Sequence, residues 1–150
     1  MVILGILAAI VVPYFANASQ EARMNALSSI TRSVQFKIAE QTARAGSPPA
    51  ELDPTWFVEG HLPGNPENVI GVPAVETTST EGMIHPANKV LKTGVGGAFW
   101  YNAAHGIIRA RVAERATAAA TLDVYNRVNQ SSENNLGNYG GGAGSGGGGS

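Results

Sequence analysis

The chain has 150 residues, with 10 basic and 11 acidic side chains and a formal net charge of −1. This length indicates one domain. The balanced charge gives no indication of a nucleic-acid partner, which would usually appear as a basic stripe. Because the chain contains no cysteine, a disulfide framework and a thiolate metal site are both excluded.

The first twelve residues, MVILGILAAIVV, carry no charge and no hydrogen-bonding side chain. As a helix they would be about 18 Å long, whereas a membrane-spanning helix needs about 20 apolar residues. A signal peptide is a second interpretation, with a small-residue cleavage site at residues 16–18, although no Lys or Arg precedes the apolar run. A buried core helix is the third interpretation for a run of this length.

The residues after Pro13 have the pattern of an amphipathic helix. Apolar residues recur at spacings of three and four, at Met24, Leu27, Ile30, Val34 and Ile38. The opposite face carries the polar and charged residues Glu21, Arg23, Asn25, Arg32 and Lys37. We predict one long helix over residues 1–45, with an apolar stem at 1–13 and an amphipathic half at 14–45, ended by Gly46. Pro13 removes one backbone hydrogen bond and is expected to bend or loosen this helix.

The segment ILGILAAIVVPYF, followed by an amphipathic helix, resembles the N-terminus of type IV pilins and of type II secretion pseudopilins. The resemblance is close over residues 2–20 and includes Gly5, the small pair Ala8-Ala9 and Pro13. A looser resemblance relates GGAFWYNAAHGIIRARV to the strand–turn–strand hairpin of major pseudopilin heads. Together they imply an α+β fold in which a long N-terminal helix packs on a small antiparallel β-sheet head.

The resemblance implies a structural subunit of a type IV pilus or a type II secretion pseudopilus, and not an enzyme. Before assembly, such a subunit is located in the bacterial inner membrane. It then interacts with the secretion or pilus assembly machinery and is incorporated into a periplasmic or extracellular filament. Its partners are further copies of itself, with no nucleic acid and no cofactor expected. The implied filament and membrane interface is the apolar stem: Val2, Ile3, Leu4, Gly5, Ile6, Leu7, Ala8, Ala9, Ile10, Val11, Val12 and Pro13.

The family also implies a longer N-terminus than the one in this sequence. About nine further residues, including an acidic one, precede the position of Met1, and adding them would give the apolar length that a bilayer demands. We therefore expect this sequence to be a truncated subunit.

Residues 46–130 are predicted to form the head, with a hairpin at 98–112 and a short helix at 117–129. The hairpin strands are rich in aromatic and β-branched residues and flank a turn that ends in Gly106. Strict alternation along the second strand predicts one face packed on the long helix and one face in solvent. The packed face carries Ile108, Ala110 and Val112, and the solvent face carries Ile107, Arg109 and Arg111.

The remaining segments are rich in Pro, Gly and Asn and are predicted to be loops. Within them we expect a helical turn at 54–58 and short extended pieces at 69–72 and 89–91. Residues 131–150 are expected to form a flexible tail, and the composition of residues 146–150 favours an appended linker over a native Gly-rich end.

The polar residues of the sequence show no recognisable catalytic or metal motif. His61, His85 and His105 occur in loops or turns, and their spacing matches no set of metal ligands. Major pseudopilins often hold calcium in an acidic C-terminal loop, but Asp123 and Glu133 are too few carboxylates to predict such a site. We therefore predict no catalytic residue and no metal site, and an envelope enzyme is the weakest hypothesis.

The head aromatics suggest an alternative function. Trp56, Trp100 and Tyr101 could form a binding platform for a sugar, although aromatic side chains in a small domain more often belong to the core. On this alternative the chain is a membrane-tethered module whose head recognises a polysaccharide or a secreted substrate.

Overall fold

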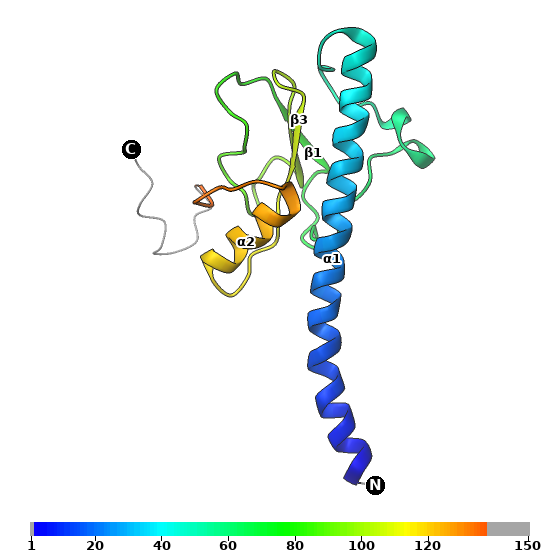
Figure 1. Cartoon of the computed structure of the whole chain (residues 1–150), viewed down its shortest axis with the longest axis vertical. Helices are drawn as coiled ribbons and strands as arrows, with labels where there is room; N and C mark the ends of the chain where they lie inside the picture. Colours follow the sequence, from blue (N-terminus) through cyan, green and yellow to red (C-terminus); the bar gives the residue numbers. More distant parts are fainter. Residues whose placement is uncertain (1, 138–150) are drawn as a thin grey trace.

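The computed structural model describes the backbone of residues 2–137 and the side chains of residues 19–137. Figure 1 shows one long helix, α1, whose C-terminal half packs beside a small sheet and a second helix, while its N-terminal end extends beyond this head. The α+β class with an N-terminal helix is therefore confirmed. The elements are α1 (Val2–Ala45), 3₁₀ helices at Pro54–Trp56 and Val58–Gly60, β1 (Val75–Thr78), β2 (Phe99–Asn102), β3 (Ile107–Ala110) and α2 (Ala118–Asn129).

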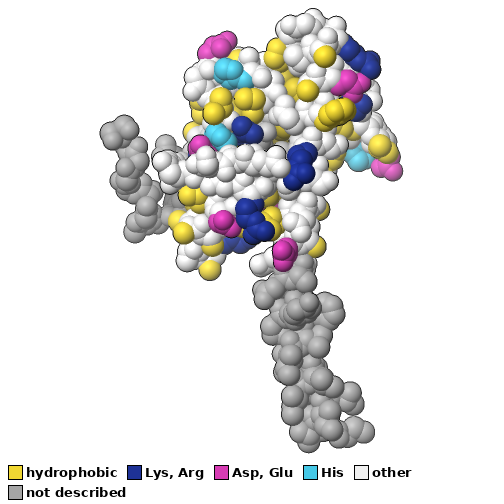
Figure 2. Space-filling view, viewed as in Figure 1, with side chains coloured by type: hydrophobic (Ala, Val, Ile, Leu, Met, Phe, Trp, Pro, Cys, Tyr) yellow, Lys and Arg dark blue, Asp and Glu magenta, His cyan; other side chains and the backbone are white. Residues whose placement is uncertain are grey.

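The predicted apolar stripe of α1 forms its contact with the head. Leu27 and Val34 are fully buried, and Ile30 is half-buried against the same core. The helix ends as predicted at Gly46, which has a φ of +84° and donates its N–H to the carbonyl of Thr42 at 2.8 Å. Glycine reaches this left-handed conformation without the steric cost that a side chain would add. Basic and acidic side chains are interspersed over the visible face of the head (Figure 2).

The sheet has the order β1-β2-β3 and is mixed. The predicted hairpin is confirmed, because β2 and β3 pair antiparallel with Phe99 opposite Ala110. The prediction of a purely antiparallel sheet is wrong, since β1 pairs parallel to β2 with Val75 opposite Phe99. Residues 79–98 carry the chain back to the starting end of the sheet, and a connection of this length permits the parallel crossover. Of the predicted extended pieces, residues 89–91 contribute a single bridge between Val90 and Val112.

The face of the hairpin predicted to meet solvent is covered in large part, with Arg111 buried and with Ile107 and Arg109 half-buried. Trp100 and Arg111 are each 3% exposed, and the loop of residues 79–91 is hydrogen-bonded to this face. Three side chains of the hairpin donate hydrogen bonds to backbone carbonyls of this loop. Asn102 donates to the carbonyls of Thr80 and Met83. Arg109 donates to the carbonyl of Ile84, and Arg111 donates to that of Asn88. The polar residues of the alternating pattern therefore hold a loop, and the central strand β2 is buried along its whole length.

Two amide side chains cover the outer edge of β3. Gln35 of α1 accepts from the N–H of Ile108 at 3.0 Å and donates to the carbonyl of Gly106 at 2.8 Å. Asn129 of α2 exchanges both backbone hydrogen bonds with Ala110, at 2.7 and 2.9 Å. These amides form hydrogen bonds with backbone N–H and C=O groups at the edge of β3, which could otherwise pair with another strand. They also orient both helices against the sheet.

The short helix α2 is confirmed, but the flexible tail begins later than predicted. Thr117 caps α2 by accepting from the N–H of Ala120 at 3.0 Å. Residues 131–137 then pack on the head, where Leu136 is 5% exposed and its carbonyl accepts from the N–H of Lys89 at 3.3 Å. The prediction of a flexible tail is therefore wrong for residues 131–137. Burial of the Leu136 side chain and the backbone hydrogen bond between Leu136 and Lys89 outweigh the polar composition of this segment. Residues 138–150, including the predicted linker, lie outside the described residues.

Replacing Gly97 with alanine should destabilise the head by about 1–3 kcal/mol through overpacking. A Cβ atom at position 97 would meet the backbone of β1, including the Cα of Val75 at 2.8 Å, where no side chain can rotate away. Urea unfolding measures the loss. The control is Gly64→Ala, whose Cβ would have nothing within 4 Å. Equal unfolding midpoints for the two variants would contradict the close approach at position 97.

Candidate functional site

The predicted filament and membrane interface, residues 2–13, lies outside the side chains that the structure describes. Its backbone belongs to α1, which is assigned as helix without interruption through position 13. Within the described part of the chain, no helix combines the length and the hydropathy needed to cross a membrane. The assignment of this segment to an interface therefore stays a prediction.

The predicted aromatic platform is not an exposed surface. Tyr101 is fully buried and Trp100 is 3% exposed, while Trp56 is half-buried and packs against the core. The hydroxyl of Tyr101 donates to the carbonyl of Pro49 at 2.5 Å, and burial raises the pKa of Tyr101 to about 12, so the phenol keeps its proton. The interpretation of Trp100 and Tyr101 as a binding surface is thus wrong, because β2 is the central strand of the sheet.

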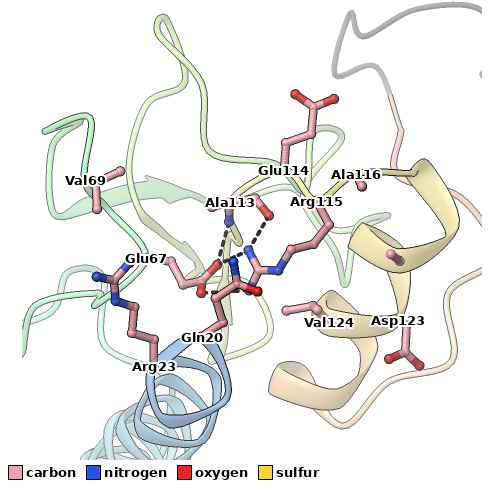
Figure 3. A pocket seen from close by; sticks show the side chains of 11 residues that line it. Gln20, Arg23, Glu67, Val69, Ala113, Glu114, Arg115, Ala116, Asp123 and Val124 are labelled. Carbon is pink, nitrogen blue, oxygen red and sulfur yellow. Dashed lines mark hydrogen bonds and ion pairs between the residues drawn. The ribbon is translucent and has the colours of Figure 1, made fainter. Parts of the chain in front are cut away.

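A surface groove with a volume of about 620 Å³ lies where α1, α2 and the loop around Glu67 meet. Figure 3 shows Gln20 and Arg23 on the α1 side, Asp123 and Val124 on the α2 side, and Glu67 between them. The residues that line it are Gln20, Arg23, Glu67, Val69, Ala113, Glu114, Arg115, Ala116, Ala120, Asp123 and Val124. Sequence reasoning missed this groove, because its walls come from three segments far apart in the chain.

An ion pair between Glu67 and Arg115 forms the inner wall of the groove. The two guanidinium nitrogens of Arg115 donate to the two carboxylate oxygens of Glu67 at 2.8 and 2.9 Å, and the N–H of Ala113 donates to the same carboxylate at 2.9 Å. The Glu67 side chain is 3% exposed and that of Arg115 is 17% exposed. Such a bidentate pair is fixed in geometry, and its charges are already satisfied within the protein. The groove lining includes no histidine or hydroxyl side chain, and its titratable acids are Glu67, Glu114 and Asp123.

A second polar cluster surrounds His85, which contacts Tyr125 of α2 and Glu133 of the segment after α2. The Nδ1 atom of His85 lies 2.8 Å from the hydroxyl of Tyr125, and its Nε2 atom lies 3.7 Å from the carboxylate of Glu133. Lys89 pairs with the same carboxylate at 3.2 Å and lies over the Tyr125 ring. Burial, followed by the positive charge of Arg109, lowers the pKa of His85 to about 4.

The His85 cluster does not have the properties of a catalytic site. Tyr125 is fully buried, and burial holds its pKa far above the ordinary value, so the hydroxyl stays protonated and out of reach of a substrate. The other two histidines have separate partners: exposed His61 lies 3.3 Å from Glu59, and His105 bonds the carbonyl of Glu81. Among the described residues, no group of three or more His, Asp or Glu side chains could hold a metal ion.

Comparisons with protein-family models, curated proteins and solved structures find no match for this chain. Its function is therefore inferred from its own sequence and fold.

Proposed function

We propose that the chain is a structural subunit of a pilin-type or pseudopilin-type filament, which polymerises through the apolar N-terminal part of α1. The observation that supports this proposal most is the length of α1 relative to the head. The helix has 44 residues, Val2–Ala45, and among its described side chains the first buried one is Met24. At 1.5 Å per residue it is about 66 Å long, and among its described side chains those that join the head core lie from Met24 onward.

The apolar surface of the stem must be buried by something other than the head, because none of the described contacts of the head involves the stem. Residues 2–12 are apolar throughout, so a helix there presents apolar surface in every direction. Fully burying one Val, Leu or Ile side chain is worth about 1.5–3 kcal/mol, and the stem carries eight of them, so burial contributes on the order of 10 kcal/mol per subunit. Lipid before assembly and the stems of neighbouring copies afterwards are the environments that supply this burial.

The head, in contrast, is a self-sufficient unit that a filament could display on its outside. Its core joins residues of α1, β2, β3 and α2. Within the described part of the chain, every buried side-chain nitrogen or oxygen has a hydrogen-bond partner. We propose that the inner membrane holds the subunit first, that assembly machinery then moves it, and that the filament is periplasmic or extracellular.

Electron microscopy of the full chain, released from detergent, tests this proposal. We expect thin helical filaments whose centre is formed by packed α1 stems and whose outside is formed by heads. A protein that stays monomeric in all native conditions, with and without lipid, would overturn the proposal.

A further inference from the structure

The two edges of the three-stranded sheet differ in how their backbone groups are satisfied. On the β3 edge, the side chain of Gln35 accepts from the N–H of Ile108, and the side chain of Asn129 bonds both backbone groups of Ala110. These amides occupy the positions that a further strand would need. In the described part of the chain, the β1 edge has no comparable cover.

The pairing of β1 with β2 identifies which backbone groups of β1 point outward. The N–H of Phe99 donates to the carbonyl of Ala74 at 3.0 Å, and every second residue of a parallel strand bonds the same neighbour. The N–H and C=O groups of Val75 and Thr77 therefore point away from β2. Within the described residues these groups form no hydrogen bond, and Thr77 is exposed.

Another extended polypeptide has the chemistry that matches this edge. N–H and C=O groups that alternate at strand spacing are satisfied together by the backbone of an added strand. Among the described strands, a second copy of this chain can offer only its own β1 edge, because Gln35 and Asn129 already cap the β3 edge. The same edge then meets itself across a two-fold axis, and the two β1 strands run antiparallel.

We propose that two copies of the chain pair through their β1 edges, in the register that places Thr77 opposite the partner's Thr77. In this register each Thr77 donates its N–H to the carbonyl of the other, and Glu76 lies across from the partner's Thr78. A register centred on Glu76 would instead place two carboxylate side chains directly opposite each other, on Cα atoms about 4.5 Å apart. Like charges in that position destabilise a strand pair, so the electrostatics favour the register centred on Thr77.

The pairing is independent of the proposed filament function, because β1 lies in the head and the proposed filament contact lies in the stem. A strand of four residues buries little surface, so we expect free subunits to pair weakly and reversibly. A two-fold axis does not relate neighbours along one polar filament. Where filaments form, the pairing therefore joins the heads of two filaments, and its repetition along their length strengthens the contact.

Cysteine substitution in the full chain tests the pairing, because the chain contains no cysteine of its own. In the proposed register the two Cα atoms at position 77 lie about 5.5 Å apart, within the range that a disulfide spans. Under mild oxidation, Thr77→Cys should therefore form a covalent dimer at least about tenfold faster than Ala119→Cys, an exposed position on α2. Non-reducing electrophoresis measures the two rates, and circular dichroism checks that both variants are folded.

Thr77→Lys provides a second variant, because it places two positive charges opposite each other at the paired edge. It should reduce self-association in sedimentation and separate any bundled filaments, whereas Ala119→Lys should behave as the parent chain does. Equal cross-linking rates at positions 77 and 119, or a Thr77→Lys chain that associates as the parent does, would overturn the pairing. Fast cross-linking at position 77 in a chain that forms no filaments would support the pairing and overturn the filament proposal.

Discussion

Replacing Ile6 with aspartate should abolish filament formation while leaving the head folded. The substitution places a carboxylate in the middle of the stem, where the proposed neighbours are lipid chains and the apolar side chains of other copies. A charge in such surroundings costs about 3 kcal/mol or more per subunit, and a helical polymer repeats that cost at every position. Negative-stain microscopy and sedimentation measure the loss of polymer.

The matched control for this prediction is Ile6→Val, which keeps the stem apolar and should still form filaments. Circular dichroism on heating should give the same midpoint for both variants, because the described core of the head begins at Met24. Filaments of normal appearance from Ile6→Asp would show that the stem does not form the polymer interface. In that case any filament would have to form through contacts between the heads of neighbouring copies.

Replacing Glu67 with alanine should destabilise the head by about 3–5 kcal/mol. The change leaves the Arg115 guanidinium partly buried without its counter-charge and removes the acceptor of the Ala113 N–H. The cost of removing one partner exceeds the net worth of the pair, because the remaining charge keeps its desolvation penalty. Urea unfolding of the full chain measures the difference in the free energy of unfolding.

The double variant Glu67→Ala with Arg115→Ala should recover part of this loss, because neither charge is then left alone. Glu40→Ala is the control at a more accessible site: the Glu40 side chain is 29% exposed and pairs with Lys37 and Arg44 of the same helix, and its loss should shift the unfolding curve much less than the loss of Glu67. A Glu67→Ala curve that overlays the Glu40→Ala curve would contradict the structural role assigned to the buried pair.

Local patterns were sufficient to predict the helices and the hairpin. The spacing of Met24, Leu27 and Val34 identified the buried face of α1, and Gly46 identified its end, because both signals lie within a few residues of the feature they specify. The turn before Gly106 likewise defined the antiparallel pairing of β2 and β3. None of these predictions required knowledge of which distant segments meet.

The candidate sites could not be predicted in the same way. Glu67 and Arg115 are 48 residues apart, and no motif joins a loop carboxylate to an arginine that precedes α2. His85 and Tyr125 are 40 residues apart and meet only after α2 has packed against the loop. Alternation along β3 correctly separated Ile108 from Arg109, but it could not reveal that residues 79–91 would cover the polar side.

By itself, the sequence determined a long N-terminal helix, its apolar stem, the hairpin and the short second helix, because helical and strand periodicity are properties of neighbouring residues. Only the tertiary structure decided that the sheet is mixed, that Trp100 and Tyr101 are core residues, and that residues 131–137 pack on the head. Each of these depends on contacts between segments far apart in the chain, whose burial outweighs the local preference for solvent or for disorder.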